Sequence, residues 1–423
     1  MERELEYRSK CGIPLYVYKN TAQHGFYVSV FARCGSMYES EGDEGITHLL
    51  EHCLIRNVNK LYGGTLYAEL DAEGMEFNAS TYSEMLQFYV TAATGKFSTG
   101  MAVLGKLFSP ITLSRREMDA EKMRVKAEIR ESDDKSSLSS FTAARVFVGT
   151  PLAHSIVGTN GSVDAVSLTR LEAYRRTALC SGNVFFYITG NVTDADIAEA
   201  LAAIDGFDIV KGEGNSNLAP VPSDFFRRPR EVFVKNSDYT AVRLTFDLDM
   251  SRMSVAETDL LYDSLITGYN SRLFIELSEK RGLVYDISGN LERYRNVGTL
   301  SFFFEVNGRH TEQAVEIVVS VLNSMKSSEG ITCIKAGYTD NAFLLYDDMR
   351  ELNFTFAYDN HIMSEGYTSV AERRERYAAV TEHRLAELAC MLFVRDNLTV
   401  TLKADKRRTD TAALGAILDR LDT

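Results

Sequence analysis

The order of predicted elements repeats once along the chain, and this repeat constrains the fold more than any other sequence feature. Strand-like runs of the first half lie at 13–19, 25–33, 75–81, 85–92 and 183–189. Runs of the second half follow the same order at 230–235, 241–249, 283–291, 298–306 and 398–404. Pairs of strands interrupted by helices, with one strand late, are typical of an α+β sandwich. We therefore expect two similar α+β halves.

Helical patterns fill the intervals between these strands. In the first half they are expected at 45–56, 64–73, 96–108, 115–134, 138–147, 168–179 and 193–204. In the second half they are expected at 254–267, 271–280, 311–325, 332–350, 381–393 and 409–421. Apolar residues at a period near 3.6 support these assignments, whereas the exact ends of each element are less well defined by the pattern.

A segment poor in packing residues separates the halves. The run KGEGNSNLAPVPSD at 211–224 holds two of the chain's six prolines, and Pro229 follows closely. Such a composition predicts an extended linker. We expect an N-terminal domain at 1–212, a linker at 213–229 and a C-terminal homologous domain at 230–423.

Composition excludes several classes of protein. The 423 residues are 45% hydrophobic and 25% charged, as in a globular chain. The net charge of -13 argues against a nucleic-acid partner and suits a basic peptide, although acidic cytosolic proteins are common. No run reaches the roughly 18 apolar residues of a membrane helix, so no membrane partner is expected. The charged start MERELEYRSK lacks an apolar core, which predicts a cytoplasmic protein with reduced cysteines.

One segment, GITHLLEHCLIR at 45–56, has the order of residues that metal chemistry requires. On a helix, His48 and His52 are four residues apart and share a face, so both imidazoles can approach one ion. Glu51 lies on the same face and can take a proton from a water molecule beside that ion. This is the H-x-x-E-H order of the inverzincins. The alternative is a surface helix that carries two solvated histidines.

A catalytic zinc ion takes three protein ligands and leaves one position for water. The helical pattern at 115–134 carries Glu121 and Glu128, which are two turns apart on one face. Glu128 could be the third ligand, and Glu121 could orient a ligand or the water. Taken alone, acidic residues on a charged helix more often form a solvated face.

Together these residues resemble the pitrilysin family of inverzincin metallopeptidases, which includes mitochondrial processing peptidase and insulin-degrading enzyme. The family's third zinc ligand is a glutamate about 76 residues after the second histidine, with another glutamate seven residues before it. Those positions are Glu128 and Glu121 here. Further similar segments are LYAELDAEGMEFNAST at 66–81, TPLAHSIVGT at 150–159, SGNVFFYITGNV at 181–192 and SRLFIELSEKRGLVYDIS at 271–288.

The resemblance implies a LuxS/processing-peptidase-like metallohydrolase fold, in which two α/β-sandwich halves form a clamshell. The N-terminal half would hold one zinc ion on His48, His52 and Glu128, with Glu51 as base and Glu121 in support. Asn78 and Ala79 match the family's Asn-Ala edge strand, which implies that an extended peptide adds to this strand. Tyr285 of the second half would contact the substrate. The implied function is a zinc endopeptidase that cleaves short or unfolded peptides within a chamber.

One position departs from the family pattern. Active members carry an arginine seven residues before the tyrosine, and this chain has Ser278 there. A serine cannot supply the charged, planar fork of a guanidinium. Arg281 is the nearest candidate to replace it.

Three explanations remain open for this substitution. The chain could be the zinc subunit of a pair, either a homodimer or a heterodimer, whose partner carries the Arg/Tyr pair. It could also act alone without the arginine, or it could keep zinc after its activity has decayed. The rival function is a non-catalytic clamshell subunit for binding or assembly. No phosphate-binding loop, dinucleotide fingerprint or serine nucleophile elbow is present.

Overall fold

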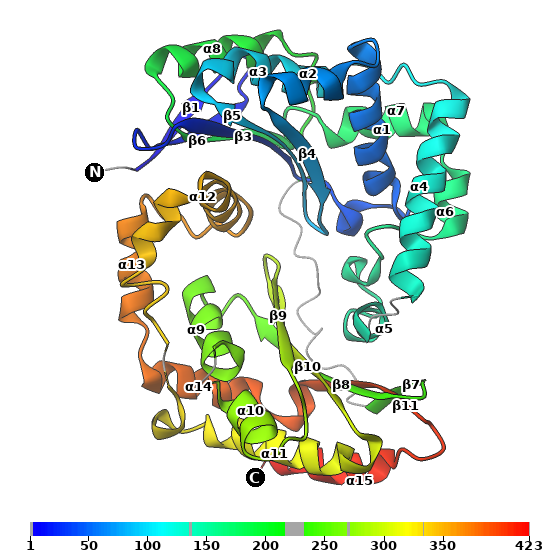
Figure 1. Cartoon of the computed structure of the whole chain (residues 1–423), viewed down its shortest axis with the longest axis vertical. Helices are drawn as coiled ribbons and strands as arrows, with labels where there is room; N and C mark the ends of the chain where they lie inside the picture. Colours follow the sequence, from blue (N-terminus) through cyan, green and yellow to red (C-terminus); the bar gives the residue numbers. More distant parts are fainter. Residues whose placement is uncertain (1–2, 135–137, 216–231, 269–270, 333, 423) are drawn as a thin grey trace. The chain divides into compact units, whose positions relative to one another are not determined.

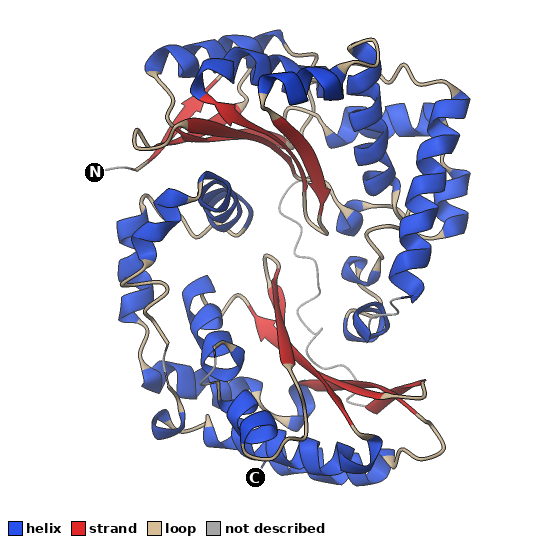
Figure 2. Cartoon of the chain, in the orientation of Figure 1, coloured by secondary structure: helices blue, strands red, loops and turns tan. Residues whose placement is uncertain are grey.

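The computed structural model describes residues 3–134, 138–215, 232–268, 271–332 and 334–422. Two compact units divide the chain, and each contains one β-sheet with its own hydrophobic core (Figures 1 and 2). The first unit comprises residues 1–135, 154–218 and 343–370, and the second comprises 136–153, 219–342 and 371–423. The mixture of sheets and helices confirms the predicted α+β class.

Six strands form the sheet of the first unit, in the order β1-β2-β6-β3-β5-β4. The strands are β1 Glu4–Arg8, β2 Pro14–Lys19, β3 Gly25–Ala32, β4 Glu76–Thr81, β5 Leu86–Ala93 and β6 Val184–Gly190. Its helices are α1 Ile46–Leu61, α2 Leu66–Glu73, α3 Phe97–Gly105, α4 Arg115–Asp134, α6 Asn160–Ala165, α7 Leu168–Ala178, α8 Asp194–Gly206 and α12 Met349–Phe356.

The second unit repeats the order of β2 to β6, and its described residues contain no counterpart of β1. Its sheet has the order β7-β11-β8-β10-β9, built from β7 Val232–Asn236, β8 Thr240–Asp249, β9 Ile287–Arg293, β10 Val297–Val306 and β11 Leu398–Ala404. Its helices are α5 Leu138–Val146, α9 Val255–Ile266, α10 Arg272–Phe274, α11 Thr311–Ser324, α13 Val370–Ala379, α14 Glu382–Leu392 and α15 Thr411–Leu418. In each sheet one parallel pair, β2/β6 or β7/β11, is followed by antiparallel strands. The two halves are therefore homologous in architecture, as the sequence repeat predicts.

The two halves also exchange a segment. Helix α5 comes from the first half of the sequence but packs on β11 and β8, where Thr142 and Thr401 share a hydrogen bond of 2.6 Å. Helix α12 comes from the second half but packs on β6 and β3. Since β6 and β3 occupy the places in the first sheet that β11 and β8 occupy in the second, the exchange is reciprocal. The compact units are thus interleaved along the chain.

The expected division into domains at 1–212 and 230–423 stays a prediction, and residues 216–229 of the expected linker lie outside the described residues. The helix expected over 332–350 is wrong. A short 3₁₀ helix spans Ala342–Asp347, and α12 begins only at Met349. Asp348 starts this new helix because its carboxylate accepts the N–H groups of Arg350 and Glu351 at 2.9 and 3.0 Å.

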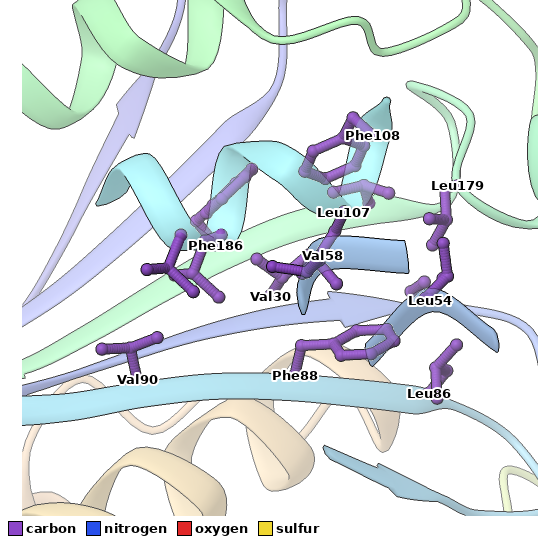
Figure 3. Close-up of a cluster of buried hydrophobic side chains, with 14 of the residues drawn as sticks. Val30, Leu54, Val58, Leu86, Phe88, Val90, Leu107, Phe108, Leu179 and Phe186 are labelled. Carbon is purple, nitrogen blue, oxygen red and sulfur yellow. The ribbon is translucent and has the colours of Figure 1, made fainter. Parts of the chain in front are cut away.

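Packing on the first sheet fixes the helix that carries the H-x-x-E-H residues. Leu54 and Val58 of α1 are fully buried and lie against Val30 and Phe88 of the sheet, as Figure 3 shows. Burial of a leucine or valine side chain stabilises a fold by about 1.5–3 kcal/mol. The apolar face of α1 is therefore held on the sheet, and its polar face is turned toward α4, which it contacts.

Candidate functional site

A glycine and a buried carboxylate set the start of α1. Gly45 has φ +84°, and a Cβ at this position would lie 2.7 Å from the carbonyl oxygen of Val157. The Glu39 carboxylate accepts the backbone N–H groups of Gly45 and Thr47 at 2.8 and 2.9 Å. These bonds satisfy N–H groups that a helix start leaves without partners. The first turn of α1, which includes His48, is thus fixed in position.

The three predicted metal ligands converge in the first unit. One ligand atom from each of His48, His52 and Glu128 lies within 4.8 Å of the others. The Nε2 atom of His48 is 3.4 Å from one Glu128 oxygen, and the Nε2 atom of His52 is 3.5 Å from the other. Ligands about 2.0–2.1 Å from a tetrahedral zinc ion are separated from one another by roughly 3.3 Å. The nitrogen-to-oxygen spacing therefore fits that coordination, and two imidazoles with one carboxylate are donors that zinc accepts.

The protonation state of His48 also suits metal coordination. Burial, reinforced by the neighbouring His52, lowers the pKa of His48 to about 4. The imidazole of His48 is therefore neutral near pH 7, which is the form that binds a metal. Burial also acts to lower the pKa of His52, but Glu121, Glu128 and Glu51 outweigh it and raise the pKa.

Glu121 supports this cluster from behind. Its side chain is only 1% exposed, and one oxygen lies 3.6 Å from Nδ1 of His52. Arg56 binds the same carboxylate at 2.5 Å and Arg124 at 3.2 Å. Burial works against the charge, yet the bonds from His52 and Arg56 hold the pKa of Glu121 below its usual value. Glu121 can therefore fix the ring of His52 so that Nε2 faces Glu128.

Glu51 lies on the same face of α1, beside the end of strand β4. The hydroxyl of Thr81 donates to one oxygen of Glu51 at 2.5 Å. Burial raises the pKa of Glu51, and this hydrogen bond opposes the effect in part. A raised pKa brings a carboxyl group closer to the range in which it can both accept and release a proton.

The predicted substrate strand, β4, borders a cavity beside the H-x-x-E-H helix. Glu51, His52 and Asn78 all line a cavity of about 880 Å³. Asn78 and Ala79 lie on β4, which is the edge strand of the first sheet. Asn78 is exposed, and its side-chain oxygen accepts the N–H of Ala79 at 2.8 Å. The structure thus brings the edge strand and the H-x-x-E-H helix to one site, while the substrate roles of Asn78 and Ala79 stay predictions.

Ser278 and Tyr285 lie in the second unit. Ser278 is part of the π-helical turn Ile275–Glu279, and Tyr285 is 96% exposed. Arg281 is held by Glu276, whose carboxylate and carbonyl oxygens it binds at 2.5 and 2.7 Å. Arg281, the expected substitute for the arginine that is missing at position 278, is therefore already bound to Glu276. The role of Tyr285 on a substrate stays a prediction.

Three contributors to the site are missed by sequence reasoning. Thr81 holds Glu51, whereas Arg56 and Arg124 hold Glu121. The only available signal is position, because Arg56 follows His52 by four residues and Arg124 follows Glu121 by three. Such spacing predicts shared helix faces, but it does not reveal which faces of separate helices meet.

Two models of one peptidase family together match most of the chain. The model for the insulinase family, peptidase family M16, matches residues 15–160. The model for the peptidase M16 inactive domain matches residues 165–332. The first segment lies mainly in the first unit, whereas the second begins in the first unit, with α7, β6 and α8, and continues into the second unit.

Two relatives carry names that specify a zinc protease. A protein of Rickettsia bellii named an uncharacterized zinc protease is 23% identical over 70% of this chain and 71% of its own length. The Bacillus subtilis protein named uncharacterized zinc protease YmxG is 21% identical over 77% of this chain and 79% of its own length.

Solved structures share the fold at low identity. A protease from Helicobacter pylori has a TM-score of 0.78 and 17% identity, covering 96% of this chain and all of that chain. A peptidase M16 inactive domain from Pseudomonas fluorescens has a TM-score of 0.81 and 16% identity, covering 95% and 98%. The periplasmic protease PqqL from Escherichia coli matches this whole chain with 50% of its own, with a TM-score of 0.77 and 16% identity.

Within the described residues, no helix has both the length and the apolar character that a membrane crossing requires.

The two family models together span most of the chain, and the repeated fold and the H-x-x-E-H helix agree with them. The chain belongs to the insulinase family of peptidases, family M16.

Proposed function

We propose that this chain is a zinc-dependent endopeptidase, or the zinc subunit of a two-subunit peptidase, that cleaves short or unfolded peptides. The observation that carries this proposal is the convergence of His48, His52 and Glu128 beside Glu51. The names of the relatives, which specify zinc proteases, support the same kind of chemistry.

Each residue of the site has a chemical task in this proposal. A bound zinc ion supplies a Lewis acid that polarises the scissile carbonyl and makes water a better nucleophile. The Glu51 carboxylate removes the proton from the attacking water and delivers it to the departing amine. Thr81 holds that carboxylate in place, and Glu121 holds the ring of His52. Strand β4 binds the peptide through main-chain hydrogen bonds, which favours extended chains over particular sequences.

The metal assignment is tested by the zinc content of purified protein. We expect one zinc ion per wild-type chain after loading at neutral pH, and its loss in His52→Ala and Glu128→Gln. Glu131→Gln is the matched control, because Glu131 lies on the same helix and is exposed. Equal zinc content in all four proteins would contradict the assignment.

Catalysis requires a separate variant. Glu51→Gln should keep zinc and lose cleavage of a quenched fluorescent peptide, since Glu51 serves as the base rather than as a ligand. Cleavage at the wild-type rate by Glu51→Gln would exclude this role.

Ser278 favours action with a partner. We propose that a homologous chain, in a homodimer or a heterodimer, supplies the Arg/Tyr pair that this chain has only in part. This chain corresponds to half of the longer PqqL chain, which is consistent with a site built from two such pieces. Loss of one preorganised donor to a developing oxyanion lowers kcat by about 10²–10³. Cleavage that needs the co-purified homologue, or a gain of activity in Ser278→Arg, would support this proposal.

A second candidate is a non-catalytic subunit for binding or assembly. Ser278 and the match of residues 165–332 to an inactive-domain model favour it. Zinc binding without cleavage, both with and without the homologue, would select this candidate over the peptidase.

A further inference from the structure

The outer edge of β4 has backbone groups that can bind a peptide strand. Tyr82 donates its N–H to the Met85 carbonyl at 2.8 Å, which sets the register of the β4–β5 hairpin. Hydrogen-bonded pairs alternate along an antiparallel ladder. The backbone groups of Phe77, Ala79 and Thr81 therefore point away from β5, and the N–H of Ala79 bonds the Asn78 side chain instead.

Side chains of an added strand would alternate between two different walls. Phe77 and Ala79 pack against the core, and Thr81 binds Glu51, so these residues face the H-x-x-E-H helix. The intervening residues of β4 face the opposite side of the sheet. On that side lies α12, whose Asn353 bonds the carbonyl oxygen of Tyr187 at 3.1 Å (Figure 1).

One face of α12 follows the β4–β5 hairpin. Arg350, Phe354 and Tyr358 recur every four residues, the last of them in the π-helical stretch Ala357–Ile362. The Arg350 guanidinium lies 5.1 Å from the ring centre of Tyr89, which pairs with Asn78.

The next two residues of this face continue along the hairpin. Phe354 lies 5.7 Å from the ring of Tyr82, and the Tyr358 hydroxyl donates to Glu84 at 2.9 Å. These contacts advance along the hairpin in the same order as along the helix, so this face of α12 follows the β4–β5 hairpin, while the helix as a whole packs on β6 and β3.

Arg350 is the charged member of this face, and its guanidinium lies over the ring of Tyr89. Among the described residues, its guanidinium makes no hydrogen bond and no ion pair within 4.0 Å, and the side chain is exposed. The nearby carboxylate of Glu76 accepts the hydroxyl of Tyr89 at 2.5 Å. Phe354 and Tyr82 are half-buried rings one turn further on, so a cation and an apolar surface lie in sequence along the strand.

We propose that α12 forms the second wall of the substrate groove, and that it selects an extended peptide with an acidic side chain at Arg350 and an apolar side chain at Phe354. This inference rests on the proposed peptidase function. Side chains on one face of a strand recur about every 6.6–6.8 Å, and four residues of a helix rise about 6 Å. Neighbouring side chains on one face of the peptide can therefore meet successive residues of α12.

The test uses peptides with acetylated and amidated ends, so that the only acidic group is a side chain. Glutamate is moved through each position of one host peptide, with glutamine and lysine at the same positions as references. Binding is measured by fluorescence anisotropy with zinc-loaded Glu51→Gln protein, and cleavage is measured as kcat/KM with wild-type protein. Binding thus has a readout that does not require catalysis.

The arginine should set the charge preference at one peptide position. We expect wild-type protein to bind the peptide with glutamate at this position about two- to fivefold more tightly than the peptide with glutamine, which is the range of an exposed ion pair. Arg350→Ala should remove this preference, and Arg350→Glu should reverse it toward lysine. Arg8→Ala is the matched control, because Arg8 is exposed on β1 at the opposite edge of the same sheet.

The aromatic residue should set the apolar preference. Phe354→Ala should weaken binding of a peptide with leucine, relative to serine, at the neighbouring position on that face. Phe354→Leu should restore it, which a loss of folding would not do.

The outcomes separate this inference from the function on which it rests. The inference is overturned if wild-type protein shows no charge preference, or if the preference is unchanged in Arg350→Ala and Arg350→Glu. Cleavage of the peptides in that case still supports the peptidase function. Binding with an Arg350-dependent preference but no cleavage upholds the groove and contradicts catalysis by this chain alone. No binding of any peptide contradicts both.

Discussion

The contact between Glu121 and His52 gives a quantitative prediction. Replacing Glu121 by glutamine keeps the size of the side chain but removes the charge that lies 3.6 Å from Nδ1 of His52. The glutamate is almost fully buried, so solvent does not replace the lost interaction. Loss of such an outer partner of a metal-bound histidine lowers metal affinity by about 10–100-fold, or about 1.4–2.7 kcal/mol.

Competition with a chromogenic zinc chelator measures this change. Glu117→Gln is the control, since Glu117 lies one turn earlier on α4, lines the same cavity and pairs with Lys60 at 2.8 Å. We expect wild-type zinc affinity in Glu117→Gln and the full loss in Glu121→Gln. An affinity in Glu121→Gln within twofold of wild type, with the fold intact by circular dichroism, would refute the supporting role of Glu121.

Three further predictions concern the framework of the first unit. Gly45→Ala should lower the free energy of unfolding by about 1–3 kcal/mol in urea titrations, because the residue has φ +84° and its new Cβ would lie 2.7 Å from a carbonyl oxygen. The control is Gly42→Ala, which should have the smaller effect because Gly42 has a similar φ of +89° but lies in open space. Asn353→Leu should lower the free energy of unfolding by about 1–3 kcal/mol, because Asn353 is fully buried and its loss leaves the Tyr187 carbonyl and the Ser29 hydroxyl without this partner. An unchanged urea midpoint would contradict the anchoring of α12 by Asn353. Burial raises the pKa of Cys53 to about 12, so a thiol reagent at pH 8 should label exposed Cys11 and spare Cys53 until urea unfolds the protein, as peptide mass spectrometry would show.

The metal cluster is the part of the site that sequence reasoning predicts best. His48 and His52 lie one turn apart on a helix, so their shared face follows from local geometry alone. The choice of Glu128 over the other acidic residues of α4 depends on the family resemblance, because a charged helix offers many carboxylates. Thr81 illustrates what neither argument reveals, since its bond to Glu51 joins residues thirty positions apart through the packing of a strand beside a helix.

For the fold, local sequence patterns predict the order of the strands, but they do not predict that α12 packs on the sheet of the first half. The repeated order of strands gives two sheets with equivalent topology. The segment 332–350 has helical periodicity, yet α12 begins at Met349 because Asp348 supplies the cap. Nothing in the pattern of α12 specifies that it packs on the sheet of the first half, since that choice depends on buried hydrogen bonds such as those of Asn353. The second wall of the proposed groove is therefore visible only in the structure.

The most direct test of the metal centre is anomalous diffraction at the zinc edge from crystals of the purified chain. We expect one peak per chain, roughly 2.0–2.2 Å from a nitrogen of His48, a nitrogen of His52 and an oxygen of Glu128. A zinc peak held by other residues, or its absence from crystals grown with excess zinc, would contradict the central claim that these three side chains form a metal site.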